Sequence, residues 1–488
     1  MNIEKLLKHI KYENINGAKL SAEITALCDD TRKITKGCLF FCIKGIRVDP
    51  HKMIKEIEEK GAAAVLTDNE ADITGVKIPV LRTDNTRSAL SVLAVKFYYH
   101  QDELLRLIGI TGTNGKTSTS YFTEALLIEA GKRTAVIGTV GVKENGRDLG
   151  IEFTTATTPD TLELIDIFKK LADMAVDTVV MEVSSHSLAL NKVEGLSFKV
   201  GVFTNLTQDH LDFHETMENY FDAKAKLFNL CEYGVINADD EWGKKLIKIS
   251  ACKTLTYGIS PECDFRAVNI KYSPDGVNYE LKYLESYVDV YVPVPGTFTV
   301  YNSLAAIAAG FALNIPLGKI ISAVSKIKPV PGRIQSIPNN KKITIIVDYA
   351  HTPDSLRAII NSVRDFSKKV ITVFGCGGDR DNTKRPVMGE IAGKFSDYCV
   401  ITSDNPRSEE PMDIINQIET GIIKTNCPFE KTEDRRQAIY SAISRAEEGD
   451  TVIIAGKGHE DYQEIKGIKH HFNDAEVVRE ICKAGESI

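Results

Sequence analysis

The chain has 488 residues, of which 43% are hydrophobic and 26% charged, and its formal net charge is −7. This length predicts about three domains, and the composition is that of an ordinary globular protein with little room for disorder. The acidic balance gives no support to a general nucleic-acid-binding role, although it leaves local binding of anionic small substrates open.

Three further features exclude other classes. The N-terminal segment, residues 1–17, is charged and lacks the apolar core of a signal peptide. No stretch of the sequence reaches the ~18 uninterrupted apolar residues that a membrane span needs. The ten cysteines are scattered without a CxxC pair, so neither a zinc ribbon nor a disulfide framework is indicated. We therefore expect a cytoplasmic protein with reduced thiols, no membrane insertion and no nucleic-acid partner.

Short apolar runs alternate with turns and segments of helix length along most of the chain. Residues 1–102 mix such runs, at 38–43 and 62–66, with turn residues, which predicts a small α/β domain. From Leu104 a series of buried strands begins, which is typical of a mostly parallel, doubly wound sheet. We assign this pattern to a second domain, residues 103–330, with a helix at 117–130 and strands at 104–110, 135–138, 178–183, 200–204 and 234–237.

The pattern changes twice after that series. Residues 264–295 alternate with period two, which predicts an antiparallel hairpin. The run from Pro329 to Arg333 is rich in turn residues and marks a second boundary. Residues 331–488 again read as an α/β domain, with strands predicted at 343–348, 370–375, 398–404 and 451–456.

The sharpest local signal is the segment GITGTNGKT, residues 109–117, between a predicted strand and a predicted helix. Backbone N–H groups of such a turn, with the positive end of the following helix, bind a polyphosphate. Lys116 is expected to reach the β- and γ-phosphates, and the Thr117 hydroxyl to bind Mg²⁺. The segment departs from the strict phosphate-loop pattern at Ile110, where that pattern has glycine. Nucleotide binding is predicted, but the loop alone suits a GTPase switch, a kinase or a ligase.

Polar residues follow two predicted strands at the edge where ligands bind in open α/β sheets. Glu182 ends one strand, and His210 and His214 follow the next. Glu182 is a candidate Mg²⁺ ligand because hard carboxylate oxygens suit this ion. The alternatives are a capped strand end and hydrogen-bonded structural histidines.

A predicted amphipathic helix at 220–228 carries Lys224 and Lys226. On spacing alone, both lysines belong to a solvated face.

Four predicted strands of the last domain end in loops that carry charge and glycine. Arg385 and Arg407 lie in two of these loops, and guanidinium groups bind carboxylates and phosphates through paired hydrogen bonds. Ordinary polar turns are the alternative. The loops are residues 348–354, 375–386, 404–411 and 456–460.

Together these motifs closely resemble the Mur ligases, and within them the members that add the third amino acid to a UDP-linked peptidoglycan precursor. The resemblance covers the whole chain. Its motifs are residues 30–32, 37–40, 111–117, 157–159, 182–186, 205–210, 224, 301–302, 332–333, 348–354, 375–386, 404–407 and 456–460.

The resemblance implies three domains: an N-terminal UDP-substrate domain, a central ATPase and a C-terminal Rossmann-like domain that receives the amino acid. It implies a monomeric enzyme with ATP, two Mg²⁺ ions and a carbamylated Lys224. ATP would convert the carboxylate of a UDP-N-acetylmuramoyl dipeptide into an acyl phosphate, and an amino acid would displace phosphate from it.

Residue roles follow from the same resemblance. The implied catalytic residues are Lys116, Lys224, His210 and Glu182, and the implied metal ligands are Thr117, Glu182, His210 and Lys224. The implied ATP contacts are Gly112, Thr113, Asn114, Gly115, Lys116, Thr117, Ser118, Asn302 and Arg333. The implied UDP-substrate contacts are Thr31, Thr157, Thr158, Ser184 and Lys192. The implied amino-acid contacts are Arg385, Asp404, Asn405, Pro406, Arg407, Gly456 and Glu460.

Two positions depart from some relatives, which carry Gln and Arg where Leu190 and Lys192 stand here. The segment 404–407 resembles the signature for meso-diaminopimelate, whose distal carboxylate Arg407 can pair with. The alternatives are an L-lysine-adding ligase, a folylpolyglutamate-type or D-Ala-D-Ala-adding ligase, and a nucleotide-dependent switch without ligase activity.

Overall fold

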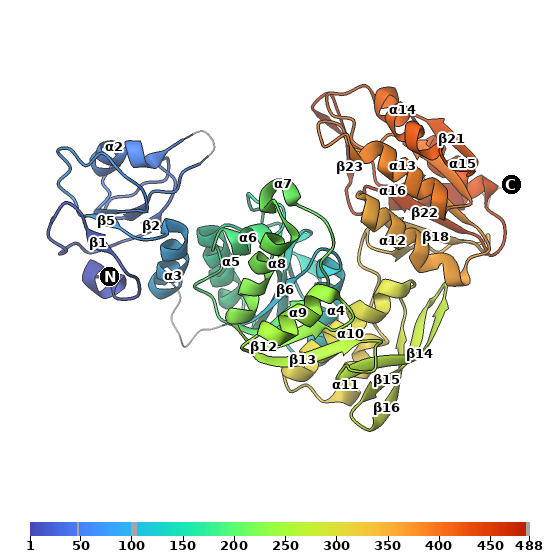
Figure 1. Cartoon of the computed structure of the whole chain (residues 1–488), viewed down its shortest axis with the longest axis horizontal. Helices are drawn as coiled ribbons and strands as arrows, with labels where there is room; N and C mark the ends of the chain where they lie inside the picture. Colours follow the sequence, from blue (N-terminus) through green and yellow to red (C-terminus); the bar gives the residue numbers. More distant parts are fainter. Residues whose placement is uncertain (46–47, 99–104, 485–488) are drawn as a thin grey trace.

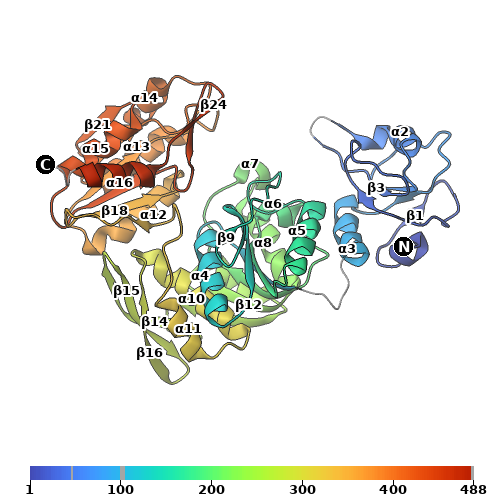
Figure 2. The ribbon, with the colours of Figure 1, turned by 180° about the vertical axis from the view of Figure 1, so that it is seen from behind.

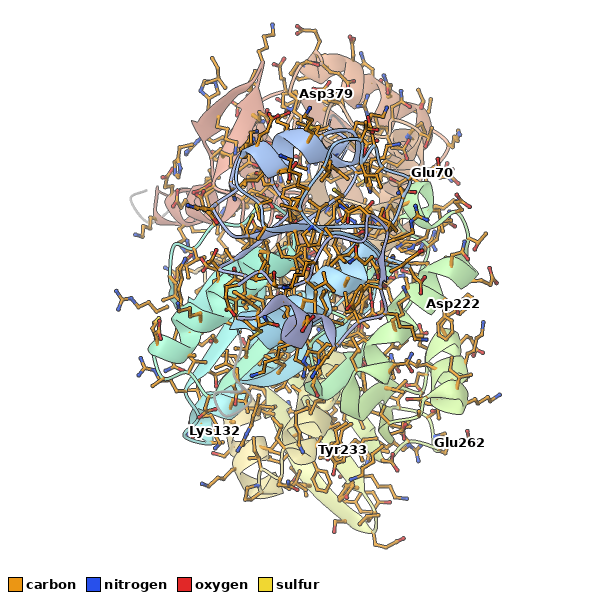
Figure 3. All side chains as sticks on the ribbon, turned by 90° about the vertical axis from the view of Figure 1, so that its left-hand side faces the viewer. Glu70, Lys132, Asp222, Tyr233, Glu262 and Asp379 are labelled. Atoms are coloured by element: carbon orange, nitrogen blue, oxygen red, sulfur yellow. The ribbon has the colours of Figure 1, made fainter. Side chains whose placement is uncertain are left out.

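The computed structural model describes residues 1–45, 48–98 and 105–484; Leu104 and the boundary expected near residue 102 lie outside these ranges. Within them the chain folds as three α/β units in chain order (Figure 1). The view from behind also shows the central unit between the other two (Figure 2). Charged side chains such as Glu70, Asp222 and Glu262 are exposed at the periphery (Figure 3). No helix in the described ranges is both long and apolar enough to span a bilayer.

The N-terminal unit is a small sheet with strand order β1-β5-β4-β3-β2, parallel apart from the β1–β5 pair. Because side chains alternate along a strand, Leu39 and Phe41 of β3 pack towards α1 and α3, and Phe40 packs towards α2. The elements are α1 Ile3–Leu7, β1 Glu13–Asn14, β2 Leu27–Cys28, β3 Leu39–Phe41, η1 Pro50–Lys52, α2 Ile54–Glu59, β4 Ala64–Thr67, β5 Val80–Arg82 and α3 Thr86–Tyr98.

The central unit is one long sheet with strand order β16-β15-β14-β13-β12-β11-β6-β10-β7-β8-β9. The strands from β14 to β7 run parallel, and antiparallel strands extend both edges. The strands are β6 Arg106–Thr111, β7 Thr134–Gly138, β8 Gly141–Glu144, β9 Arg147–Asp148, β10 Thr178–Glu182, β11 Phe198–Phe203, β12 Cys231–Asn237, β13 Lys253–Gly258, β14 Phe265–Ser273, β15 Gly276–Tyr283 and β16 Ser286–Val292. The predicted antiparallel region therefore exists, and it continues the main sheet.

Helices cover both faces of this sheet because its inner strands are apolar on both sides. Ile108 and Ile110 of β6 pack with α4, α10 and α11, whereas Leu107 packs with α5. Helix α5 also contacts α3 of the N-terminal unit. The helices are α4 Lys116–Glu129, α5 Thr161–Asp173, α6 Ser185–Ala189, α7 Leu211–His214, α8 Met217–Ala225, η3 Lys226–Asn229, α9 Glu241–Ile249, α10 Thr297–Ala312 and α11 Leu317–Val324.

The helix predicted over residues 220–228 is wrong in its extent. Helix α8 starts earlier, after the N-cap Thr216, whose side chain accepts from Asn219 N–H at 3.1 Å. It ends at Ala225, and the next residues form the 3₁₀ turn η3. Lys224 therefore belongs to an α-helix and Lys226 to a 3₁₀ turn, and the two lysines do not share one helical face.

The C-terminal unit has strand order β17-β18-β22-β19-β20-β21, parallel apart from the β17–β18 pair. Helices α12 to α14 pack on one face, and α15 and α16 on the other. The elements are β17 Gln335–Ser336, β18 Thr344–Asp348, α12 Pro353–Val363, η4 Arg364–Phe366, β19 Val370–Phe374, α13 Lys384–Phe395, β20 Tyr398–Thr402, α14 Pro411–Ile422, β21 Phe429–Thr432, α15 Arg435–Arg445, β22 Thr451–Ala455, β23 Tyr462–Ile465, β24 Ile468–His471 and α16 Asp474–Ala484. The predicted α/β fold class is confirmed.

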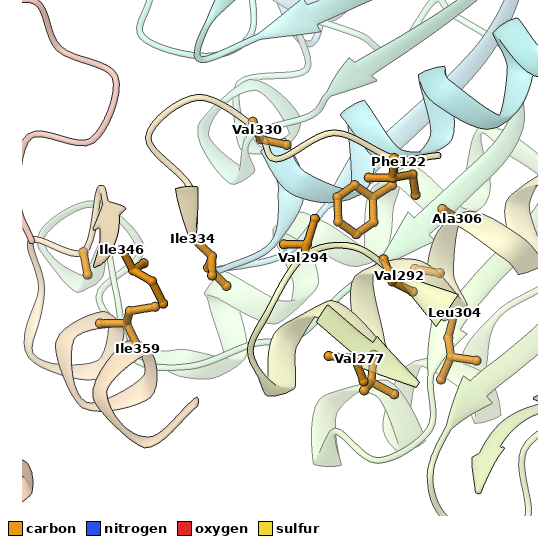
Figure 4. Close-up of a cluster of buried hydrophobic side chains, with 14 of the residues drawn as sticks. Phe122, Val277, Val292, Val294, Leu304, Ala306, Val330, Ile334, Ile346 and Ile359 are labelled. Carbon is orange, nitrogen blue, oxygen red and sulfur yellow. The ribbon is translucent and has the colours of Figure 1, made fainter. Parts of the chain in front are cut away.

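Apolar contacts join the central and C-terminal units. Phe122 of α4, Val294, Val330 and Ile334 belong to one buried cluster at the junction (Figure 4). The same cluster continues into the C-terminal unit through Ile346 of β18. The candidate residues at the strand ends of both units are therefore carried on elements with a common core.

Candidate functional site

The glycine-rich turn between β6 and α4 is shaped by close backbone approaches. A Cβ at Gly112 would lie 1.9 Å from Thr204 Oγ1, and Gly115 has φ of +83° at the N-cap of α4. Thr113 and Asn114 donate their N–H groups to Asn205, to its carbonyl at 2.9 Å and to its Oδ1 at 3.0 Å. The turn is thus fixed at the N-terminus of a helix, where backbone amides and the helix dipole favour phosphate.

Two lysines, the half-buried Lys116 and the buried Lys224, meet at one carbonyl of this turn. Lys116 Nζ donates to the carbonyls of Gly112 at 2.8 Å and Thr113 at 2.9 Å, and Lys224 Nζ donates to Gly112 at 2.9 Å. Lys224 is 1% exposed, and its Nζ lies 4.6 Å from the ring centre of Tyr220. The solvated-face interpretation of Lys224 is therefore wrong.

Burial lowers the pKa of both ammonium groups, and the charge of Lys116 lowers that of Lys224 further. A lysine with a strongly depressed pKa is a neutral amine at neutral pH, and this is the form that reacts with carbon dioxide. Lys226 differs: it is exposed, and its Nζ donates to Asn191 Oδ1 at 2.9 Å.

Glu182, the last residue of β10, fits the donor chemistry of a Mg²⁺ ligand. It is 1% exposed, and its Oε1 accepts from Thr117 Oγ1 at 3.0 Å. Thr139 donates to the same carboxylate through its N–H at 3.0 Å and its hydroxyl at 3.1 Å. The two predicted ligands Thr117 and Glu182 are therefore adjacent and present the hard oxygen atoms that Mg²⁺ prefers.

His210 lies in the loop after β11, on the Lys224 side of the turn. Its ring centre is 4.9 Å from that of His186 and 6.2 Å from that of Tyr220, which Lys224 also contacts. Burial lowers the pKa of His210 and His186, and it lowers the pKa of the neighbouring His214 to about 4. These imidazoles are therefore held neutral near pH 7, in the state that binds a metal ion. Among the described residues no ready-made cluster of at least three His, Cys, Asp or Glu ligands is present.

Three of the predicted UDP-substrate residues, Thr157, Thr158 and Ser184, lie close to Glu182. Thr158 Oγ1 donates to the Glu182 carbonyl at 3.0 Å and accepts from Ser184 N–H at 2.9 Å. Thr157 Oγ1 lies 3.3 Å from Thr139 Oγ1. Their hydroxyls therefore line the same strand end as the candidate metal ligand.

The remaining UDP-substrate candidates lie where the N-terminal unit meets the central one. Lys192 forms an ion pair with Asp160, and its carbonyl accepts from Ser91 Oγ of α3 at 3.2 Å. Thr31 is half-buried, and the nearby Asp29 has its pKa raised by burial and then by Asp160. The 29–32 loop thus faces the segment that holds Lys192.

Asn302 and Arg333 contribute to one pocket beside the phosphate turn. Asn302 Oδ1 accepts from Thr119 Oγ1 at 3.2 Å, and the Arg333 guanidinium lies over the Tyr349 ring at 4.6 Å. Arg333 Nε is buried without a hydrogen-bond partner among the described residues. The pocket is lined by Ser118, Phe122, Val294, Thr299, Asn302, Val330, Arg333 and Ile334.

Arg385, at the start of α13, is almost fully buried and engaged within the chain. Its Nη1 and Nη2 donate to the two carboxylate oxygens of Glu409, both at 2.8 Å. Nη1 also donates to Gln417 Oε1 at 2.9 Å, and Nη2 to the Gly377 carbonyl at 3.2 Å. The hydrogen bond from Arg385 lowers the pKa of Glu409 to about 2. Arg385 therefore ties two predicted amino-acid loops together.

A buried polar network joins the 404–407 and 456–460 loops. Asn405 Nδ2 donates to Glu460 Oε2 at 2.8 Å, and Lys457 Nζ donates to Asn405 Oδ1 at 3.0 Å and to Glu460 Oε2 at 3.1 Å. Gly456 has φ of +119°, which disfavours any other residue, and a Cβ there would lie 2.5 Å from Asp404 Oδ2. The structure thus gathers these predicted residues at adjacent strand ends.

Arg407 follows Pro406 and stands at the edge of the same network. It has φ of +51°, and its Nη1 donates to the Gly378 carbonyl at 2.7 Å. Its Nε lies 3.6 Å from Glu464 Oε2 on β23. A cation and an anion therefore lie side by side here, partly open to solvent.

The sequence interpretation missed several partners of these residues. Thr139, Glu409, Lys457 and Glu464 each hold a predicted site residue through a bond described above. Glu409 and Lys457 lie within the loops 404–411 and 456–460, so their charge beside a candidate residue could have identified them from the sequence. No sequence feature identifies Thr139 or Glu464, since each is distant in sequence from the residue it contacts.

Known families match three parts of the chain. The family described as Mur ligase middle domain matches residues 110–310. The Mur ligase glutamate ligase domain matches residues 332–458, and the Mur ligase family catalytic domain matches residues 23–98.

Relatives of full length are also similar. A Clostridioides difficile (strain 630) protein named UDP-N-acetylmuramoyl-L-alanyl-D-glutamate--2,6-diaminopimelate ligase is 45% identical, covering 98% of this chain and 99% of that protein. A protein of the same name from Caldanaerobacter subterraneus subsp. tengcongensis is 43% identical, and the match covers 100% of both chains.

Solved structures agree. A structure of a ligase of that name matches with a TM-score of 0.74 and 31% identity, covering 100% of this chain and 99% of that one. The MurF ligase from Thermotoga maritima in complex with ADP shares the fold, with a TM-score of 0.61, 18% identity and coverage of 94% and 97%.

Proposed function

This chain belongs to the Mur ligase family, and on that premise we propose that it is an ATP-dependent ligase joining meso-diaminopimelate to UDP-N-acetylmuramoyl-L-alanyl-D-glutamate in peptidoglycan precursor synthesis. The observation that carries the proposal is the 45% identity, over 98% of the chain, to a ligase of that name. The proposal assigns UDP-substrate binding to residues 1–102, ATP binding to 103–330 and amino-acid binding to 331–488. It further assigns a monomer, since one chain supplies every candidate residue, and a cytoplasmic location.

The proposed reaction has two steps. The substrate carboxylate attacks the γ-phosphorus of ATP, and the bond from that phosphorus to the bridging oxygen breaks. ADP is released, and the substrate becomes an acyl phosphate. The amine of the amino acid then attacks the acyl carbon and loses a proton, and phosphate leaves. Activation is needed because a carboxylate is a poor electrophile, whereas phosphate is a good leaving group.

Lys116 would supply positive charge beside the transferring phosphoryl group. Burial now depresses its pKa. A bound polyphosphate would raise that pKa again, because a nearby anion favours the protonated amine. Gly112 to Ser118 would bind the phosphates through the turn and the N-terminus of α4, and Asn302 and Arg333 would contact the rest of the nucleotide.

Thr117 and Glu182 would hold one Mg²⁺ ion, and His210 with carbamylated Lys224 would hold a second. The ions would neutralise phosphate charge as it shifts during transfer. Support for the carbamate is the burial of Lys224 and its strongly depressed pKa. Carbamylation of the neutral amine would place an anion beside Lys116, and the two opposite charges would attract each other.

Thr31, Thr157, Thr158, Ser184 and Lys192 would bind the UDP-linked substrate. Thr157, Thr158 and Ser184 lie close to Glu182, so a substrate bound there would end close to the candidate metal site. The Lys192 ammonium could bind an anionic substrate only after its ion pair with Asp160 breaks.

The C-terminal loops support meso-diaminopimelate over L-lysine. The distal end of diaminopimelate carries both a carboxylate and an ammonium, and the Arg407–Glu464 pair presents the two complementary charges. L-lysine offers only the ammonium and would leave Arg407 without an added partner. Arg385, Asp404, Asn405, Pro406, Gly456 and Glu460 would complete the pocket.

Phosphate release tests the proposal. With ATP and Mg²⁺, release should require both UDP-N-acetylmuramoyl-L-alanyl-D-glutamate and meso-diaminopimelate, and omission of either should abolish it. Release with glutamate and a folate instead would favour a folylpolyglutamate-type ligase. Release that needs neither substrate would favour a nucleotide-dependent switch and reject the ligase.

A further inference from the structure

A surface cavity of about 460 Å³ lies in the C-terminal unit, remote from the candidate site. It is formed where α13 and α14 end and where the segments leading into β20 and β21 begin. The candidate amino-acid loops lie at the other ends of these helices and strands. Lys394, Asp397, Lys424 and Cys427 are among the residues that line the cavity.

Two cysteine thiols meet at this cavity. Cys427 is half-buried on the cavity wall, and Cys399 of β20 is fully buried behind it. Their sulfur atoms are 3.9 Å apart. The N–H of Cys399 donates to the carbonyl of Pro428 at 3.1 Å, so the backbone holds the two residues together.

The two thiols are chemically unequal. A Cys427 thiolate accepts a hydrogen bond from Cys399, and this contact lowers the pKa of Cys427 despite the opposing effects of burial and of Asp397; the Arg364 guanidinium makes a smaller contribution in the lowering direction. Burial raises the pKa of Cys399. An accessible thiol with a lowered pKa beside a buried thiol is the arrangement in which the first is oxidised and the second resolves it.

We propose that Cys427 and Cys399 form a hydroperoxide-reactive dithiol, in which Cys427 is the residue modified from the cavity and Cys399 closes a disulfide with it. This proposal is independent of the ligase assignment. The protein's role in it is to bring the oxidant to one sulfur and to keep the second within reach.

The chemistry is balanced with a hydroperoxide as the oxidant. The Cys427 thiolate attacks one peroxide oxygen, the O–O bond breaks, and the other oxygen leaves as water or an alcohol after taking a proton. Cys427 is then a sulfenic acid. The Cys399 sulfur loses its proton and attacks Cys427, the S–S bond forms, and the hydroxyl leaves as water. Two thiols lose two electrons, and the peroxide gains them.

Other cysteines of the chain offer internal comparisons. Cys28 and Cys38 lie side by side but are both buried, so an oxidant has poor access to either. Cys263 is half-buried, and its sulfur lies 3.5 Å from the hydroxyl oxygen of Ser260, so its partner in this contact is a hydroxyl and not a second thiol. Cys231 and Cys252 also lie close together. A disulfide between them would link different peptides, so peptide mapping would distinguish it from a Cys399–Cys427 disulfide.

The test uses the purified full-length protein titrated with hydrogen peroxide, then alkylated and mapped by mass spectrometry. We expect a linked peptide containing Cys399 and Cys427 that accounts for most of the lost Cys427 thiol and disappears on reduction. Cys28 and Cys38 should keep their thiols over the same range. Conversion of Cys427 to sulfinic acid without a linked peptide would overturn the proposal, as would oxidation of Cys427 no faster than that of Cys28.

Single substitutions assign the order of events. In Cys399→Ser, dimedone should trap a Cys427 sulfenic acid at least about tenfold more than in the unmodified sequence, because the resolving thiol is absent. In Cys427→Ser, Cys399 should stay reduced, and Cys263→Ser should change neither result. Equal oxidation of Cys399 with and without Cys427 would refute the order. The mapping of the unsubstituted protein stands as the test if a variant fails to fold.

Discussion

The ion pair between Arg385 and Glu409 offers a quantitative test of how the amino-acid loops are held. Arg385 is 1% exposed and Glu409 31% exposed, and two bonds of 2.8 Å join them. Glu409→Gln leaves a buried guanidinium without its counter-charge. Breaking a buried pair from one side costs about 3–5 kcal/mol, and we expect about 3 kcal/mol because water reaches Glu409. The loss should appear in the urea-induced unfolding of the C-terminal unit.

The neighbouring Glu410 provides a matched control. It pairs with Lys466 at 3.2 Å, but both side chains are about two-thirds exposed, at 66% and 68%. Exposed pairs contribute at most about 1 kcal/mol, so Glu410→Gln should lower stability by roughly 0.5 kcal/mol or less. Equal destabilisation by the two substitutions would refute the argument that the buried cation determines the loss.

The pH dependence gives a second check on the same pair. Arg385 lowers the pKa of Glu409 from its ordinary value of 4.5 to about 2. A depressed carboxyl pKa stabilises the fold above the unfolded-state pKa, and the contribution is lost as pH falls through the folded-state value. The stability difference between the unsubstituted protein and Glu409→Gln should therefore be constant above pH 4.5 and shrink towards pH 2. A difference that does not change with pH over this range would contradict the pairing.

Three further outcomes are expected. Lys116→Ala should slow phosphate release by about 10²–10⁴-fold, because it removes charge from the phosphate turn; near-normal turnover would reject the phosphate-loop role. Lys224→Ala should be nearly inactive and partly restored by formate or acetate, whereas Lys226→Ala, whose side chain is exposed, should be nearly unchanged; equal effects would reject the carbamate. Arg407→Ala should raise the KM for meso-diaminopimelate about 10–100-fold and leave the KM for ATP unchanged, with Arg407→Lys only a partial rescue; a parallel change in both KM values would indicate a general loss of structure.

Local sequence pattern predicted much of the fold. The apolar strands and the glycine-rich turn are encoded within short windows, so β6, β10 and α4 are found close to the predicted bounds. Boundaries set by caps were harder: the side chain of Thr216 starts α8 before the periodic apolar residues begin. Pairing of β14 with β13 depends on residues in another strand, so continuation of the main sheet was not predictable from the period.

The sequence predicted which residues form the candidate site better than it predicted the contacts between them. Glu182 and Thr117 could be named from motifs, but the hydroxyl and N–H of Thr139 that fix the carboxylate come from a different strand end. The burial of Lys224 depends on tertiary packing against the phosphate turn, which helical spacing cannot reveal. Glu464 reaches Arg407 from a hairpin that follows the last predicted motif.

The most direct test of the central claim is a competition between amino acids in one reaction. Equal concentrations of meso-diaminopimelate and L-lysine are supplied with ATP, Mg²⁺ and UDP-N-acetylmuramoyl-L-alanyl-D-glutamate, and the two UDP-linked tripeptides are quantified by mass spectrometry. The paired charges of Arg407 and Glu464 predict that the diaminopimelate product exceeds the lysine product by roughly a hundredfold or more. An equal or larger yield of the lysine product would contradict the proposed substrate, and the absence of both products would contradict the ligase itself.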